Sequence, residues 1–255
     1  NLLTGMLQFP PVVMFRKMKG LPEFPPSQRG AGDVLSHLTS SVDLKQPNGS
    51  SLHVTMLPNP SHLEAVNPVA AGKVRARHMS QKIGEYSWDS HMKGVNDSSG
   101  LIGDSILCVQ VHGDAAIAGQ GINQEILAMS KLPHYAVGGS LHLVVDNQVG
   151  FTTPSERGKS SRYSSDIAYM VGAPVVHVNG DDPENVVKAT RLALQYRMKF
   201  NKDVFVEIHC VRRWGHNELD DPTFTNPLLY TNVNARLSIP DDYLQKLTDV
   251  GCMTR

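Results

Sequence analysis

Two short polar motifs in this chain contain the residue types that hold a divalent cation. Gly113-Asp114 follows one apolar segment, and Asn147 and Val149 follow the next segment of that kind. Mg²⁺ prefers oxygen ligands in near-octahedral geometry and usually keeps substrate phosphates and water in its shell. Asp114 offers a carboxylate, Asn147 an amide oxygen and Val149 a backbone carbonyl. Together the motifs predict a magnesium site that holds a diphosphate.

Each motif alone has a simpler interpretation. A Gly-Asp pair at a strand end is typical of an ordinary turn, and so is the tetrapeptide Asn147-Gln148-Val149-Gly150. Both motifs follow consecutive strand-like segments, and this arrangement favours a shared ligand over two unrelated turns.

The two motifs need strands that end at one edge of a sheet. From residue 105 onward, apolar runs alternate with helical segments, which is typical of an α/β fold with a largely parallel sheet flanked by helices. The predicted strands span residues 106–111, 141–145, 174–178 and 204–211, and the predicted helices span residues 121–131 and 163–171 and a segment beginning at Asp182-Pro183. Ligands bind such sheets beyond the carboxyl ends of the strands. Asp114, Asn147 and His216 all follow a predicted strand end.

Three regions are expected from composition and pattern. They are a helical and irregular part over residues 1–104, an α/β diphosphate-binding domain over 105–240, and a polar, frayed tail over 241–255. The first region is predicted to contain a strand at 52–57, a helix at 67–79 and a mobile loop at 82–103. In the helix after Asp182, we expect Val187, Leu194 and Met198 to form one stripe.

Composition excludes several classes of protein. The formal net charge is zero, with 24 basic and 24 acidic residues, so the chain lacks the basic surface expected of a nucleic-acid binder. No apolar run approaches the roughly 20 residues that span a bilayer. Three scattered cysteines do not form a disulfide framework or a zinc motif.

Several motifs resemble those of one enzyme family. The segment from Gly113-Asp114-Ala115 to Asn147 resembles the thiamine-diphosphate-binding motif of 2-oxo acid dehydrogenases. Four motifs in order resemble the thiamine-dependent first component of the 2-oxoglutarate dehydrogenase family, and they begin at Asn59-Pro60-Ser61-His62, His112-Gly113-Asp114, Asn147-Gln148-Val149 and Arg212-Arg213-Trp214. Residues 32–38 and Arg213-Trp214-Gly215 look more like the 2-oxoadipate dehydrogenase branch. The resemblance extends over about residues 1–240.

The resemblance implies a cofactor site. Thiamine diphosphate and Mg²⁺ would be the cofactors, with Asp114, Asn147 and Val149 as metal ligands. Ala115 and His216 would also bind the cofactor, and the family places a histidine like His216 against the diphosphate. These roles come from the resemblance, whereas the oxygen donors also follow from residue type.

The resemblance also implies substrate residues. His62 would bind the 2-oxo acid or stabilise the intermediate, as a donor near neutral pH. Asn67 occupies a position that helps to set the length of the accommodated acid. An amide there, with the branch-like motifs, favours 2-oxoadipate ahead of 2-oxoglutarate.

The family's reaction is an oxidative decarboxylation in which the acyl unit passes to a lipoyl group on a partner acyltransferase. The complex also contains dihydrolipoyl dehydrogenase, and the family implies a homodimer in the mitochondrial matrix. The glutamate that activates the cofactor comes from a separate domain in the same polypeptide. We therefore expect the chain to belong to a longer parent protein and to be catalytically incomplete alone.

Two other interpretations stay open at this point. One is an inert, truncated product that binds cofactor or a partner without chemistry. The other is a different Mg²⁺-dependent diphosphate binder, such as a nucleotide enzyme. The second is disfavoured because the chain has no Gly-rich loop ending in Gly-Lys-Ser/Thr and no dinucleotide fingerprint.

Overall fold

A computed structural model of the chain describes residues 2–22, 25, 27, 39–81, 102–216 and 219–253. The motif at residues 32–38, most of the loop predicted at 82–103, and Asn217 and Glu218 lie outside the described residues. The chain divides into two compact units, Asn1–Val66 and Asn67–Arg255. Each unit is described by itself.

The first unit contains short helices and one hairpin. The helices are the π-helix η1 (Leu2–Met6), α1 (Pro11–Met18) and the 3-10 helix η4 (Leu63–Ala65). β2 (Ser51–Met56) confirms the strand predicted here, and it pairs antiparallel with β1 (Ser40–Lys45), which we did not predict. β1 is rich in serine and has only two apolar residues. These residues lie opposite apolar residues of β2, so β1 is defined by its partner strand.

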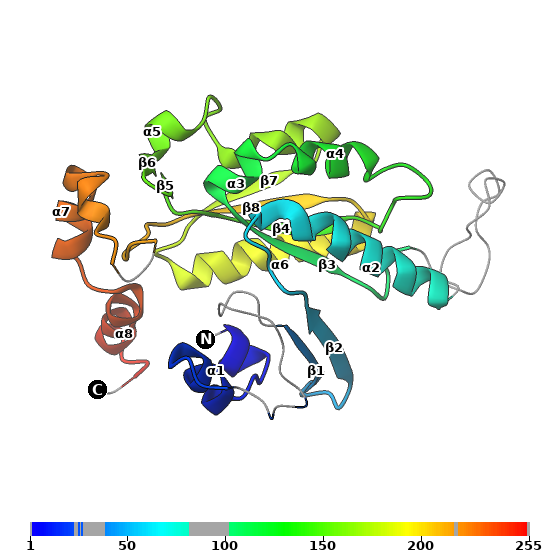
Figure 1. Ribbon diagram of the computed structural model, residues 1–255, viewed down its shortest axis with the longest axis horizontal. Helices are drawn as coiled ribbons and strands as arrows, with labels where there is room; N and C mark the ends of the chain where they lie inside the picture. Colours follow the sequence, from blue (N-terminus) through cyan, green and yellow to red (C-terminus); the bar gives the residue numbers. More distant parts are fainter. Residues whose placement is uncertain are drawn as a thin grey trace. The chain divides into compact units, whose positions relative to one another are not determined.

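The second unit is built on a four-stranded parallel sheet (Figure 1). Its order is β3-β4-β8-β7, and the strands are β3 (Cys108–Gly113), β4 (Ser140–Asp146), β8 (Val204–His209) and β7 (Val175–Asn179). All three neighbouring pairs are parallel. The predicted α/β fold with a largely parallel sheet is therefore confirmed, and each predicted strand matches an observed one within a few residues.

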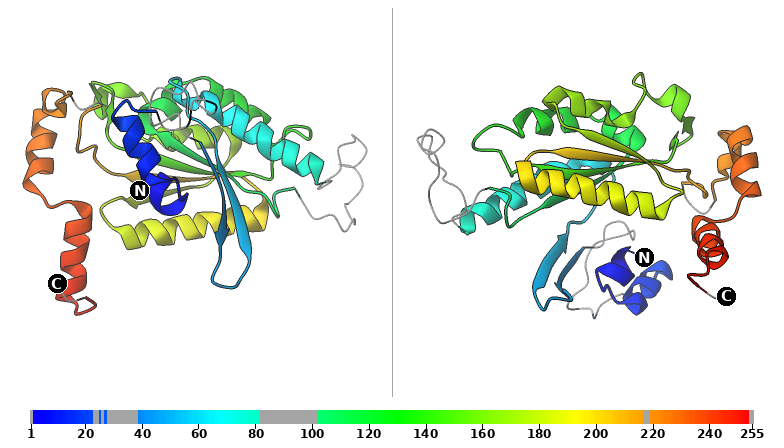
Figure 2. Two further views of the ribbon diagram at one scale, coloured as in Figure 1. Left: turned by 60° about the horizontal axis from the view of Figure 1, so that its bottom comes forward. Right: turned by 180° about the vertical axis from the view of Figure 1, so that it is seen from behind.

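Helices cover both faces of this sheet (Figures 1 and 2). One face lies under α3 (Asp114–Gly119), α4 (Ile122–Met129) and the 3-10 helix η6 (Ser164–Val171), and α6 (Pro183–Phe200) covers the other. Val144 and Phe205 pack under the first layer, whereas Leu141 and Val206 pack against α6. Successive residues of one strand thus face different layers. α2 (Val66–Ser80) confirms the helix predicted at 67–79 and packs on Cys108 of β3.

The start of α6 was predicted correctly, but its buried stripe was not. Asp182 caps the helix by accepting a hydrogen bond from the backbone N–H of Asn185. Val187 and Met198 of the expected stripe are 56% and 43% exposed, whereas the buried residues are Ala189, Ala193 and Arg197. The small side chains of Ala189 and Ala193 allow α6 to lie close to the sheet, and the larger side chains of Val187 and Met198 are exposed instead.

Several short elements complete the second unit. They are the two-residue strands β5 (Val149–Gly150) and β6 (Thr153–Pro154), α5 (Ser155–Gly158), the 3-10 helix η7 (Pro222–Phe224), α7 (Pro227–Ala235) and α8 (Ile239–Asp249). The segment expected to be a frayed polar tail therefore contains most of α8, whose N-terminus is capped by Ser238. In the described part of the chain, no helix has the length and apolar character needed to cross a membrane.

Candidate functional site

The predicted oxygen donors lie at the carboxyl ends of two adjacent strands. Asp114 follows β3 directly, Asn147 follows β4, and β3 and β4 pair in parallel. Val149 belongs to β5, which contacts α3. The chain after Gly113 forms the helix α3 at once, where we expected a loop before the next helix. Asp114 is therefore held in the first turn of a helix.

Gly150 allows β5 to lie against the start of α3. A Cβ atom built on Gly150 would be 2.8 Å from the Cβ of Ala115, closer than two carbon atoms can pack. The Ala115 side chain is one rigid methyl group and cannot move aside. This contact keeps the segment that contains Val149 next to the helix turn that contains Asp114.

We expect Gly150→Ala to weaken Mg²⁺-dependent cofactor binding by about tenfold, because β5 must move away from α3 and positioning errors of about 1 Å are costly at such sites. Calorimetry of the chain with thiamine diphosphate and Mg²⁺ measures this effect. Gly158→Ala is the matched control, since a Cβ there would be 4.0 Å from the nearest side-chain atom. Equal affinities for the two variants would contradict the assigned role.

Two buried carboxylates lie together at this edge. Asp114 and Asp146 are each 4% exposed. Burial, and then the charge and a hydrogen bond of Asp146, raise the pKa of Asp114 to about 6. The Nζ atom of Lys159 lies 3.9 Å from Oδ2 of Asp146 and offsets part of the repulsion. A cation bound here would remove the rest, so the donor set fits a divalent ion.

Asn147 lies in the turn between β4 and β5, and hydrogen bonds join this turn to the segment that follows β8. Its Oδ1 accepts a 3.2 Å hydrogen bond from the Val149 backbone N–H, and an amide oxygen has a second lone pair for a metal. Gln148 has a φ of 65° and donates from Nε2 to the Cys210 carbonyl at 2.8 Å. The backbone N–H of Arg212 donates to the Asn147 carbonyl at 3.3 Å. These bonds fix the turn that presents Asn147.

Three other predicted site residues have different surroundings. His216 is exposed, and its ring meets that of Phe151 edge-on at 5.1 Å, beside the β5–β6 turn. Asn67 is 4% exposed and donates from Nδ2 to Oδ1 of Asn123 at 3.0 Å, beneath α3. His62 is exposed and belongs to the first unit. Within the second unit, His216 therefore lies close to the β5–β6 turn. Asn67 is a buried residue whose side chain contacts Asn123.

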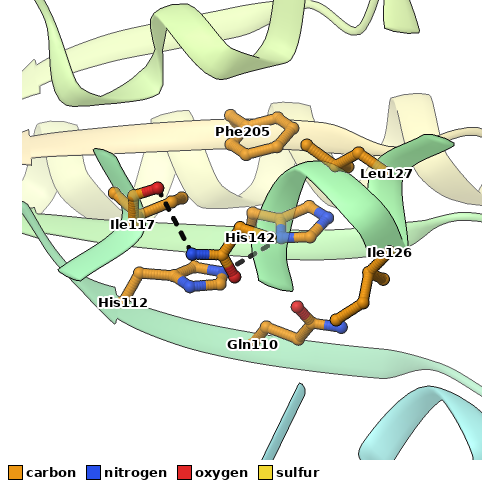
Figure 3. Close-up of a pocket in the computed structure, with 8 residues that line it drawn as sticks. Gln110, His112, Ile117, Ile126, Leu127, His142 and Phe205 are labelled. Carbon is orange, nitrogen blue, oxygen red and sulfur yellow. Dashed lines mark hydrogen bonds between the residues drawn. The ribbon is translucent and has the colours of Figure 1, made fainter. Parts of the chain in front are cut away.

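Sequence reasoning missed a buried pair of histidines behind the site (Figure 3). His112 Nε2 and His142 Nδ1 are 3.0 Å apart, and the His142 ring stacks on Phe205 at 4.2 Å. Burial alone would raise the pKa of Asp203, but His142, whose Nε2 lies 3.6 Å from Oδ1 of Asp203, and a hydrogen bond from the backbone N–H of Ser140 lower it. Gln110 and the rings of His112, His142 and Phe205 line a cavity of about 10 Å³, which is close to the volume needed for one water molecule.

The missed polar residues share one sheet face. Gln110 and His112 alternate on β3, His142 and Asp146 on β4, and Glu207 and His209 on β8, all beneath the layer of α3, α4 and η6. A period of two in otherwise apolar strands was the available signal. We predicted residues 141–145 as a nearly continuous apolar strand and did not identify the alternation in any of the three strands.

The chain matches known proteins along most of its length. The family model described as "Dehydrogenase E1 component" matches residues 29–255. The 2-oxoadipate dehydrogenase complex component E1 of Xenopus laevis is 59% identical over 254 residues, which cover 100% of this chain and 26% of that protein. The Homo sapiens protein of the same name is 58% identical over 255 residues, which cover 100% and 27%.

A more distant relative points to the same family. The protein named "2-oxoglutarate dehydrogenase, mitochondrial" of Dictyostelium discoideum is 40% identical over 248 residues, which cover 97% of this chain and 23% of that protein. The chain thus spans about a quarter of the length of these curated relatives. The matched region includes the parallel sheet and both oxygen-donor motifs, so the chain belongs to the dehydrogenase E1 component family.

Proposed function

We propose that this chain is the part of a 2-oxo acid dehydrogenase that binds the diphosphate of thiamine diphosphate together with Mg²⁺. The observation that carries the proposal is the buried carboxylate of Asp114 beside Asp146, at the strand end next to Asn147. Two buried carboxylates repel each other in the absence of a cation. Membership of the dehydrogenase E1 component family supports this choice of cofactor.

Each residue of the site then has a defined task. Asp114, Asn147 and Val149 supply a carboxylate, an amide and a carbonyl oxygen to the metal, and Ala115 packs on Gly150 to keep Val149 near it. His216 is exposed and free to approach the diphosphate as a hydrogen-bond donor. Thiamine diphosphate, when bound, supplies the electron sink for the loss of carbon dioxide from a 2-oxo acid.

For the parent protein, we propose 2-oxoadipate as the substrate, because relatives with that name are 58–59% identical to this chain. His62 would bind the acid, and Asn67 would shape the site through its contact with Asn123. The acyl group would pass to a lipoyl group of the acyltransferase in a complex with dihydrolipoyl dehydrogenase. A homodimeric parent in the mitochondrial matrix completes the proposal.

Substrate choice is tested on the parent protein. Reduction of an artificial electron acceptor gives kcat/KM for 2-oxoadipate and for 2-oxoglutarate, and we expect the longer acid to have the higher value. The 40% identity to the 2-oxoglutarate dehydrogenase of Dictyostelium discoideum supports 2-oxoglutarate as the competing substrate. A higher kcat/KM for 2-oxoglutarate would reverse the assignment.

Cofactor binding is tested on the chain itself. We expect calorimetry to show binding of thiamine diphosphate in the presence of Mg²⁺ and its loss when EDTA replaces Mg²⁺, because the oxygen donors of the chain reach the phosphates through the metal. Circular dichroism establishes that the chain is folded under both conditions. A folded chain that does not bind the cofactor with Mg²⁺ would contradict the proposal and leave the inert-fragment interpretation.

A further inference from the structure

A second cluster of metal-binding side chains lies over β7 and β8. Glu207 and His209 are two residues apart on β8, so both point to the sheet face beneath η6. His177 on β7 is the register partner of Glu207. One ligand atom from each of the three residues lies within 4.8 Å of the others. The cluster thus joins two imidazoles and a carboxylate on one surface.

The spacing of two of these atoms already suits a common ion. His177 Nδ1 and Glu207 Oε2 are 3.1 Å apart. Zinc binds such atoms at about 2.0–2.2 Å, so two ligands of one tetrahedral zinc are about 3.4 Å apart. The ligand atom of His209 lies no more than 4.8 Å from the others. A side-chain shift of about 1.4 Å or less would bring it into place.

Neighbouring groups hold the ligands as metal sites require. The Ser164 backbone N–H donates to Glu207 Oε1 at 3.0 Å, and the Ser165 hydroxyl donates to Oε2. Oδ2 of Asp146 lies 3.1 Å from His209 Nδ1 and orients the ring of this histidine. A carboxylate behind a histidine is a common arrangement around protein-bound metals.

Charge and access agree with an ion at this position. The Glu207 side chain is 0% exposed, and its ion-pair partner in the described part of the chain is His177, not a lysine or an arginine. Hydrogen bonds from Ser164 and Ser165 stabilise this buried carboxylate, and a bound metal would add the positive charge that a buried carboxylate favours. The His177 and His209 side chains are 38% and 35% exposed, so an ion can reach them from solvent.

We propose that His177, Glu207 and His209 form a binding site for a zinc-class divalent cation, separate from the site at Asp114. Imidazole nitrogen suits Zn²⁺ and Co²⁺, whereas Mg²⁺ prefers oxygen donors alone. The two sites therefore select different metals. Three protein ligands leave a further position open to water or to a ligand.

The test uses Co²⁺, which reports tetrahedral coordination through visible absorption. The chain is freed of metals, saturated with Mg²⁺ and titrated with Co²⁺. We expect one equivalent to bind with a visible band, and Zn²⁺ to displace it. His177→Gln and His209→Gln should each weaken Co²⁺ binding by about tenfold or more, the size of effect seen around metal sites. Both residues are partly exposed, and circular dichroism checks that the variants fold.

A control variant and saturation with Mg²⁺ separate this site from others. His53→Gln removes a histidine whose Nδ1 lies 2.8 Å from Asp43 Oδ1 on the β1–β2 hairpin, and it should leave Co²⁺ binding unchanged. Because Mg²⁺ is present throughout and thiamine diphosphate is absent, the Co²⁺ result does not depend on whether the cofactor binds. A folded, Mg²⁺-saturated chain without the Co²⁺ band, or a Co²⁺ affinity in both histidine variants equal to that of the wild type, would overturn the proposal and leave His177 as a partner of Glu207 alone.

Discussion

Replacing Asp114 with asparagine is expected to abolish Mg²⁺-dependent binding of thiamine diphosphate and, at the same time, to stabilise the metal-free chain. Asparagine has the same shape but no charge, so it is a much weaker magnesium ligand. Removing a group that only supports a metal ligand typically lowers metal affinity 10–100-fold. We therefore expect the loss of a ligand itself to lower Mg²⁺-dependent cofactor affinity by about 100-fold or more. The stabilisation has a separate cause in the burial of the Asp114 carboxylate and in its repulsion by Asp146.

The sign of this stabilisation follows from the pKa of Asp114, which burial and Asp146 raise to about 6 from 3.8. A carboxyl group whose pKa is higher in the folded chain favours unfolding when it ionises. Its full contribution to stability is present below the unfolded pKa and is lost as the pH rises through about 6. At pH 7 the loss is about 2–3 kcal/mol, which the Asp114→Asn variant avoids.

Urea unfolding in EDTA at pH values from about 4.5 to 7.5 measures this effect. The free energy of unfolding of Asp114→Asn should exceed that of the wild type by an amount that grows with pH. Glu125→Gln, at an exposed carboxylate on α4, controls for the removal of one negative charge and should show no such trend. A variant less stable than the wild type at pH 7.5 would show that the ionised Asp114 carboxylate does not destabilise the folded chain.

The succession of strands and helices along the chain and the location of the oxygen donors could be predicted from local patterns. β4 is a nearly continuous apolar run, and Asp182-Pro183 is a strong helix start, so both elements are defined by their own residues. Asp114 and Asn147 follow neighbouring strands, and strands of a parallel sheet end at one edge. Their proximity therefore required no knowledge of packing.

The other parts of the site depend on contacts between segments distant in sequence. Whether His142 or Leu143 faces α3 depends on which helix covers which face, and that is decided by packing of the whole domain. The pairing of His177 with Glu207 joins two strands separated by α6. The Ala189 side of α6 is buried because it fits close to the sheet, although larger apolar residues lie elsewhere on the helix. Single-segment periodicity contains none of this information.

Arg197 is the residue whose loss should destabilise the second unit most. Its side chain is fully buried and donates to the carbonyl oxygens of Gly139 at 3.0 Å and Ile106 at 2.9 Å, and also to that of Gly103. These carbonyls belong to the segments that lead into β3 and β4. One guanidinium therefore ties the C-terminal turn of α6 to the entry of two strands.

The backbone around these carbonyls cannot rearrange to find other donors. Gly139 has a φ of 78°, and a Cβ built on it would be 2.2 Å from the carbonyl carbon of Lys202. Gly103 has a φ of 100°, and a Cβ built on it would be 2.9 Å from the carbonyl oxygen of Gly138. Because the segments are packed at van der Waals contact, carbonyls that lose their donor stay buried and unsatisfied, at about 1–3 kcal/mol each.

We therefore expect Arg197→Met to lower the free energy of unfolding by about 3–5 kcal/mol, the usual cost of breaking a buried charged network. Arg197→Lys should lie between this variant and the wild type, because an ammonium group donates from one point and cannot span three carbonyls. Arg191→Met, at an exposed position of α6, controls for the loss of an arginine from the helix. Urea unfolding provides the comparison. A loss for Arg197→Met within about 1 kcal/mol of the control would mean that water satisfies the carbonyls, and that α6 does not fix the strand entries.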